Sequence, residues 1–198
     1  MNLRRGALVS LSTLALTVSL SACSSSSDSP SDSTGTGTAA ASAAATSCPT
    51  AAPQGSPSPQ WELSGTTGKI AVTGSTDSTA PAIDVTAPFS VSQTQVHTLQ
   101  AGDGPVVPET ATVSVCYEGV NGRDGKVFDS SYERGTPAEF PLDGVVTGFK
   151  KAIAGQTVGS TVAVAMAPED GYPDGMPDAG IEKGDSLVFA LKILSAQD

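Results

Sequence analysis

Aromatic and basic side chains are scarce in this chain. Its 198 residues include five Phe, three Tyr and one Trp, and 10 Lys and Arg stand against 20 Asp and Glu, for a net charge of −10. No stretch clusters Lys or Arg, and a strongly acidic chain repels phosphate backbones, so no nucleic-acid partner is expected. The length leaves room for one medium domain and some unstructured chain, and excludes two large domains.

Long apolar runs are also lacking, apart from one at the start. Arg4 and Arg5 precede an apolar segment over residues 7–20, which is shorter than the roughly 20 residues of a membrane-spanning helix. This pattern is typical of an export signal, here residues 1–22. The following Leu20-Ser21-Ala22-Cys23 resembles the lipobox of bacterial lipoproteins. We therefore expect Cys23 to be lipidated and to anchor the exported protein to the outer face of the bacterial cell membrane; a soluble secreted protein is the alternative.

Cysteine and histidine are rare as well, at three and one residues. With Cys23 lipidated, Cys48 and Cys116 remain, and an exported compartment permits disulfides. These two either form a disulfide that joins the N-terminal segment to the sheet or stay as free thiols. His97 has no nucleophile motif around it, which favours a surface role over a hydrolytic triad. The acidic residues do not follow EF-hand spacing, so no metal and no other cofactor is expected.

Composition divides the exported chain into three parts. Residues 23–60 are Ser, Thr, Ala, Gly and Pro with almost nothing large, which predicts a disordered tether. Residues 61–92 contain short alternating segments around Ile70 and Ile83; they are either a small β extension or semi-ordered packing. Residues 93–198 hold most of the aromatic rings and are expected to form the compact domain.

Alternation of apolar and polar residues predicts the strands of this domain. Val113, Val115 and Tyr117 share one strand face, with Cys116 on the other, and Asn121-Gly122 and Asp124-Gly125 supply hairpin turn chemistry before the next strand. Further strands are predicted over residues 161–166 and 187–193, and a short amphipathic helix over 146–155. The Gly- and Pro-rich residues 168–177 predict a long loop. The fold class is therefore α+β, with a curved antiparallel sheet wrapped around one short α-helix.

Several motifs in this domain resemble FKBP-type peptidyl-prolyl cis-trans isomerases, from about Val96 to the C-terminus. The matching stretches are Gly102-Asp103-Gly104, Val115-Cys116-Tyr117-Glu118-Gly119, Asp124-Gly125-Lys126-Val127-Phe128-Asp129-Ser130-Ser131, Phe140-Pro141-Leu142, Val145-Val146-Thr147-Gly148-Phe149 and Leu187-Val188-Phe189. Together they form a strong signal, although each alone would be weak.

The resemblance implies a proline-binding slot with Phe149 as its floor. The implied catalytic residues are Tyr117, Phe128, Asp129, Val146, Phe149, Tyr172 and Phe189, and the implied substrate-binding residues are Val145, Ile181, Arg134 and Tyr132. Arg134 is expected to pair with Asp129 and fix its rotamer. Ala138 falls where the family often has an aromatic residue, which makes Tyr132 the candidate to replace that wall.

The resemblance also implies the activity, isomerisation of X-Pro bonds in unfolded or nascent exported polypeptides, by a monomer. Rotating such a bond breaks amide resonance, a barrier of about 18–20 kcal/mol, and needs neither nucleophile nor metal. The alternative is a catalytically weak FKBP-like chaperone or binding module at the cell surface, which Ala138 and the altered loop would suit.

Overall fold

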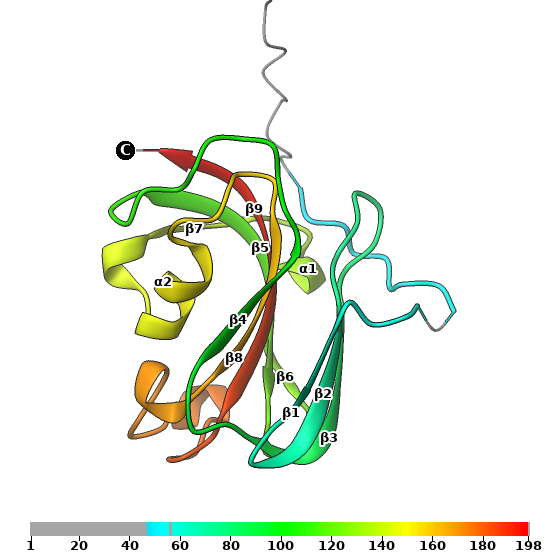
Figure 1. The fold of residues 1–198 in the computed structure, drawn as a ribbon, viewed down its shortest axis with the longest axis vertical. Helices are drawn as coiled ribbons and strands as arrows, with labels where there is room; N and C mark the ends of the chain where they lie inside the picture. Colours follow the sequence, from blue (N-terminus) through cyan, green and yellow to red (C-terminus); the bar gives the residue numbers. More distant parts are fainter. Residues whose placement is uncertain (1–46, 56, 198) are drawn as a thin grey trace, which may run out of the picture. The chain divides into compact units, whose positions relative to one another are not determined.

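The computed structural model describes residues 47–55 and 57–197, which form two antiparallel sheets (Figure 1). The smaller sheet has the order β1(Trp61–Ser64)–β2(Thr67–Thr73)–β3(Ala82–Ser90). The larger has the order β4(Gln95–Gln100)–β8(Thr161–Met166)–β9(Leu187–Gln197)–β5(Thr112–Asn121)–β6(Val127–Ser130), with β7(Ala138–Pro141) also paired to β5. The predicted signal peptide, Cys23 and the tether up to residue 46 lie outside the described residues.

The predicted helix is α2(Thr147–Ile153), and Figure 1 shows the larger sheet curving around it. This confirms the predicted α+β class. One further helical turn, α1(Ser131–Arg134), follows β6, and three 3-10 turns occupy Leu142–Gly144, Pro168–Asp170 and Pro177–Ala179. None of the helices in the described ranges has the length and apolar character needed to cross a bilayer.

Two strands of the larger sheet, β8 and β9, are buried on both faces. On β8, Val162, Val164 and Met166 face the core beneath α2, whereas Ala163 and Ala165 face the smaller sheet. All six residues of β8 are buried. Ile70, Val72 and Phe89 of the smaller sheet pack against these alanines and against Val188 and Ala190 of β9. Residues 61–90 therefore form a second layer over β8 and β9.

The segment before β1 is fixed to the domain by a disulfide between Cys48 and Cys116, with Cα atoms 5.7 Å apart. The Cys48 backbone N–H also donates to the Gly135 carbonyl at 3.1 Å, and Ala80 N–H donates to the Ala51 carbonyl at 2.8 Å. The prediction of a disordered tether as far as residue 60 is thus wrong from residue 47 onward, because composition does not reveal a covalent attachment. Cys116, expected on an outward face, is buried by this segment.

Candidate active site

Five aromatic rings meet on the face of the larger sheet that α2 covers. Tyr117 comes from β5, Phe128 from β6, Phe140 from β7, Phe149 from α2 and Phe189 from β9. Phe149 occupies the centre of the group, with ring centroids 5.9 Å from Tyr117, 5.8 Å from Phe140 and 5.5 Å from Phe189. All three contacts are edge-to-face, the geometry that aromatic quadrupoles favour. This arrangement matches the expected role of Phe149 as a floor.

Exposure increases from the centre of this aromatic cluster to its rim. Tyr117, Phe149 and Phe189 are only 5–6% exposed, whereas Phe128 and Phe140 are half-buried. A partly exposed rim above a buried floor suits a small apolar guest, because the guest can enter without displacing the core.

Gly119 makes room for two of the rings. A Cβ atom at this position would lie 2.6 Å from Phe128 Cζ and 2.8 Å from Phe189 Cε1. The backbone of β5 therefore approaches the aromatic cluster as closely as it does only because residue 119 has no side chain.

Two polar residues, Asp129 and Arg134, form a hydrogen-bonded group with Tyr117. The Tyr117 hydroxyl donates a hydrogen bond to Asp129 Oδ2, and Arg134 donates to Asp129 Oδ1 and, at 3.2 Å, to the Tyr117 oxygen. The guanidinium carbon also lies 5.8 Å from the centroid of the Tyr117 ring. The expected Asp129–Arg134 pair is thus confirmed, and it fixes the Tyr117 ring as well as the carboxylate.

These contacts define the charge states of the group. Burial raises the pKa of Asp129, but hydrogen bonds from Tyr117 and Arg134 outweigh burial and hold the pKa below its usual value. Burial, assisted by the hydrogen bond to Asp129, raises the pKa of Tyr117 to about 12. At neutral pH Asp129 is therefore a carboxylate and Tyr117 a neutral donor.

The helical turn α1 places Arg134 beside Asp129. Its N-cap, Ser130, accepts a hydrogen bond from the Glu133 N–H, and Gly135 ends the turn with a φ of 71°, a value that glycine adopts without strain. The buried Ser131 hydroxyl in turn accepts a hydrogen bond from the Tyr117 N–H at 2.8 Å. The turn is thereby attached directly to the strand that carries Tyr117.

Two further hydrogen-bond donors belong to residues that pack against the core containing the rings. Val146 is the N-cap of α2, and Tyr172 belongs to the loop between β8 and β9; both side chains pack against the core that contains the rings, as does Val145. Within the described residues, neither the Val146 backbone N–H nor the Tyr172 hydroxyl donates a hydrogen bond. Both are free to donate to a peptide carbonyl.

The same loop brings Ile181 into the core. Ile181 is 1% exposed, and its backbone forms hydrogen bonds in both directions with Met176, at 2.8 and 3.1 Å. Tyr172 and Ile181 thus lie on the same loop, and both contact the core that contains Phe149.

The prediction for Tyr132 is wrong. Its ring packs with Cys48, Cys116 and Leu194 behind the sheet, and its hydroxyl donates to Ser75 Oγ at 2.8 Å. Phe140, which sequence reasoning left out of the site, supplies the ring near Ala138 instead. The signal for it is alternation: Ala138 and Phe140 are two residues apart on β7 and share a strand face.

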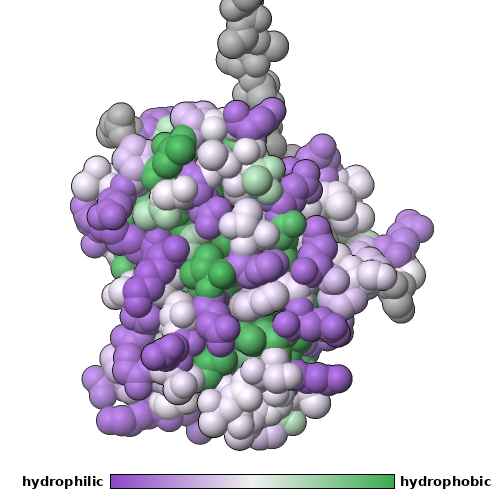
Figure 2. Space-filling model, viewed as in Figure 1, coloured by the Kyte–Doolittle hydropathy of each residue, from purple (hydrophilic) through white to green (hydrophobic). Residues whose placement is uncertain are grey.

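Hydrophobic residues on the face drawn in Figure 2 gather in separate patches between hydrophilic ones. The cluster of aromatic rings, with a neutral phenol held by an ion pair beside it, is therefore the candidate site of this α+β protein.

Comparison with known proteins agrees with this class. The family model for FKBP-type peptidyl-prolyl cis-trans isomerases matches residues 104–194. A probable FKBP-type peptidyl-prolyl cis-trans isomerase of Haemophilus influenzae is 39% identical over 94 residues, covering 48% of this chain and 39% of that protein. A probable FK506-binding protein of Corynebacterium glutamicum is 35% identical over 96 residues, covering 48% of this chain and 80% of that protein. The crystal structure of FkpA from Escherichia coli is similar with a TM-score of 0.47 and 36% identity, over 52% of this chain and 47% of that one.

The chain belongs to the FKBP-type peptidyl-prolyl cis-trans isomerase family. The match spans less than half the length of the Haemophilus relative. The family model begins at residue 104, so it does not include the smaller sheet or the segment that contains Cys48.

Proposed function

We propose that this protein is a peptidyl-prolyl cis-trans isomerase acting on X-Pro bonds of exported or envelope proteins. The observation that carries the proposal is the cluster of five rings centred on Phe149, with the Val146 N–H and the Tyr172 hydroxyl free on residues that pack against the same core. The substrate class is proline-containing unfolded or nascent polypeptide. The family membership supports the same activity.

The mechanism follows from the change in polarity as the amide twists. A planar amide is more polar than a twisted one, because twisting removes the resonance that separates charge. An apolar aromatic surface therefore disfavours the ground state more than the transition state, and only such a difference accelerates the reaction. The proline ring would lie on Phe149 while the two free donors hold the flanking carbonyls. Each tenfold acceleration requires about 1.4 kcal/mol, so a few such contacts suffice.

Asp129 and Arg134 have distinct parts in this scheme. Asp129 lies at the rim of the aromatic cluster, where it can contact the peptide, while Arg134 holds both the carboxylate and the Tyr117 hydroxyl. Arg134 therefore acts through its neighbours and is a positioning residue. The acid–base state of the group does not change during the reaction, because isomerisation transfers no proton.

A protease-coupled assay on an Ala-Pro-Phe type peptide tests the activity. Phe149→Leu and Tyr172→Phe should lower kcat/KM by about tenfold or more and several-fold, respectively. Phe149→Leu is preferred to Phe149→Ala, since truncating a buried ring to alanine costs about 3–5 kcal/mol of stability. His97→Ala, on the exposed side of β4, is the matched control and should leave the rate unchanged. A folded wild-type protein without activity that still prevents aggregation of unfolded clients would instead establish the chaperone alternative.

The proposal includes location: a monomer exported from the cell and anchored through a lipid on Cys23. It is supported by the apolar segment and lipobox-like residues before Cys23. The Cys48–Cys116 disulfide is a second support, because disulfides persist mainly outside the cytoplasm. Labelling with a fatty-acid analogue should mark the wild-type protein and not Cys23→Ala. Equal labelling of the two, or recovery of the wild type in the soluble fraction, would contradict the anchor.

A further inference from the structure

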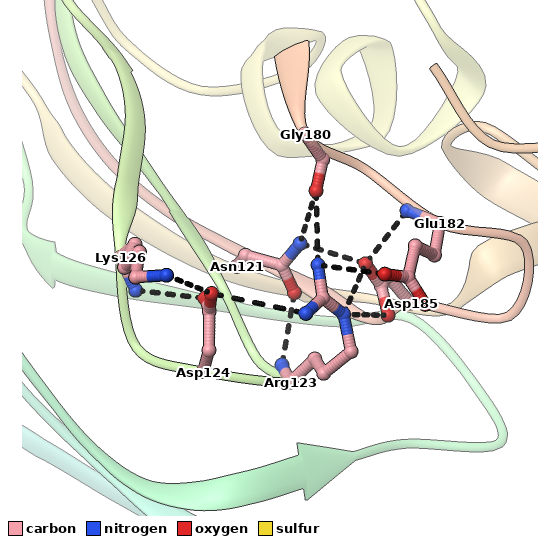
Figure 3. A network of polar contacts seen from close by, with 7 residues as sticks. All are labelled: Asn121, Arg123, Asp124, Lys126, Gly180, Glu182 and Asp185. Atoms are coloured by element: carbon pink, nitrogen blue, oxygen red, sulfur yellow. Dashed lines mark hydrogen bonds and ion pairs between the residues drawn. The ribbon is translucent and has the colours of Figure 1, made fainter. Parts of the chain in front are cut away.

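The loop between β8 and β9 is anchored to the turn between β5 and β6 by a polar network outside the aromatic cluster (Figure 3). At its centre lies Asp185, whose side chain is only 6% exposed. Its carboxylate accepts hydrogen bonds from Asn121 Nδ2 at 2.7 Å, from Arg123 Nε at 3.2 Å and from the Glu182 backbone N–H at 2.8 Å. A buried carboxylate with this many donors is a fixed point of the loop.

Arg123 spans the same stretch of loop from the other side. While its Nε contacts Asp185, its terminal nitrogen donates to the Gly180 carbonyl at 3.0 Å. The planar guanidinium therefore holds the segment at both residue 180 and residue 185, which the flexible ammonium of a lysine would not do. The side-chain oxygen Oδ1 of Asn121 fixes the turn itself by accepting a hydrogen bond from the Arg123 backbone N–H at 2.9 Å.

The loop needs such an external constraint. Gly175, Gly180 and Gly184 have φ values of 81°, 69° and 91°, and glycine loses more conformational freedom on ordering than other residues. Tyr172 and Ile181 are carried by this same loop, and both contact the core that contains Phe149. Releasing the segment near Gly180 would therefore loosen two residues of the active site together.

The network also borders the active site directly. A cavity of about 320 Å³ is lined by Asn121 and Arg123 on one side and by Ala179 and Gly180 on the other, with Phe128 of the aromatic cluster at its edge. A shift of Arg123 would consequently reach both the loop and a ring of the rim.

We propose that Arg123 and Asp185 are positioning residues of the isomerase, which keep the loop that carries Tyr172 and Ile181 closed on the aromatic cluster. The inference rests on the proposed function for its effect on rate, but the anchoring of the loop does not depend on it. The outer contacts of Arg123, to Glu182 at 3.6 Å and to Asp124 at 3.8 Å, involve exposed or distant groups and contribute little. The contact of Arg123 with the buried carboxylate of Asp185 carries the effect.

The test compares Arg123→Gln, Arg123→Lys and Asp185→Asn in the full chain with its disulfide intact. Two quantities are measured for each: kcat/KM per folded molecule on the proline peptide, and amide hydrogen exchange over residues 174–184. Lys183→Gln is the matched control, because Lys183 is a cation on the same loop and its ion pair with Asp174 is exposed.

Arg123→Gln and Asp185→Asn should each lower kcat/KM about tenfold and speed exchange of the loop amides by about the same factor. Arg123→Lys should lie between wild type and Arg123→Gln. The double variant should lose less than the two single variants combined, because both single variants remove the contact between Arg123 and Asp185. Lys183→Gln should match wild type in both measurements.

Three outcomes overturn the proposal: unchanged rate and exchange in Arg123→Gln, a loss of rate that only follows the loss of folded protein, or an equal effect of Lys183→Gln. An inactive wild type would refute the proposed isomerase function alone. The hydrogen-exchange comparison would then still decide whether this ion pair anchors the loop.

Discussion

Cys116 and Tyr117 are neighbours on β5 whose side chains lie on opposite faces of the larger sheet. The Cys116 sulfur is bonded to Cys48 behind the sheet, while the Tyr117 ring belongs to the aromatic cluster in front. Ser131 joins the two sides: its hydroxyl accepts the Tyr117 N–H at 2.8 Å and lies 3.5 Å from the Cys48 sulfur. The disulfide that attaches the N-terminal segment therefore lies directly behind the candidate active site.

Removing the disulfide should destabilise the domain. Cys48 and Cys116 are 68 residues apart in sequence. Loss of a cross-link that closes a loop of this length lowers the free energy of unfolding by about 4 kcal/mol. Urea unfolding of Cys48→Ser against wild type measures the difference. Cys23→Ser serves as control, and a reductant should abolish the gap between wild type and Cys48→Ser. Equal midpoints under oxidising conditions would contradict the expectation.

The compact unit should extend to residue 47, so that a fragment of residues 93–198 is expected to be much less stable than one of residues 47–198. The shorter fragment lacks both Cys48 and the smaller sheet, and it exposes the apolar back face of β8 and β9 around Ala163, Ala165 and Val188. Exposed apolar area of this kind favours association. Thermal unfolding combined with size-exclusion chromatography tests this; identical melting of two monomeric fragments would show that the smaller sheet is dispensable.

Gly119→Ala should reduce activity more than stability. Its Cβ would meet Phe128 and Phe189 at distances that force one ring to move, and small displacements in an active site are costly in rate. We expect about a tenfold lower kcat/KM with a cooperative unfolding transition retained. Gly144→Ala, whose Cβ would meet only the Pro141 ring at 3.3 Å, is the control. Wild-type activity in Gly119→Ala would mean that these rings do not contact the substrate.

Stability should fall at alkaline pH because of two tyrosines. Burial is the main cause that raises the pKa of both Tyr117 and Tyr132 to about 12. In an unfolded chain the pKa of a tyrosine is about 10. The folded state therefore holds more protons between about pH 10 and 12, and the free energy of unfolding decreases across that window. Below it the contribution of both groups is fully present.

Urea titrations from pH 8 to pH 12 measure this decrease. Tyr132→Phe keeps the ring and removes one titrating group, so its slope should be smaller by up to one proton, about 1.4 kcal/mol per pH unit. A slope equal to that of the wild type would show that Tyr132 titrates alike in the folded and unfolded states.

Alternation predicted the larger sheet well, because it depends only on which face of a strand is buried. It placed Val162, Val164 and Met166 correctly, as well as Tyr117 and Phe189. The other face of the strand over residues 161–166 is apolar too, since it carries Ala163 and Ala165, whereas a strand face open to water would carry polar residues. This run predicts a second layer over the sheet, which residues 61–90 supply.

The sequence could not predict where side chains point in very short elements. A helix of four residues has no periodic pattern, so nothing in the sequence indicated that α1 would turn Tyr132 to the back of the sheet. The position of Arg134 beside Asp129 was predicted only through the family resemblance. Asp185 gave no signal either, since its burial depends on Arg123, 62 residues earlier in the chain.

Alternate residues of β8 and β9 face different layers of the domain, so they can be substituted for different purposes. Even positions of β8 and, as far as residue 193, odd positions of β9, such as Val164 and Phe189, face the core beneath α2, while Ala165 and Val188 beside them face the smaller sheet. Substitutions on the face toward α2 would change the proposed substrate preference, while the residues on the other face would keep the smaller sheet attached. A lineage could therefore exchange that sheet, or a designer replace it, without rewriting the chemistry on the opposite side of the same strands.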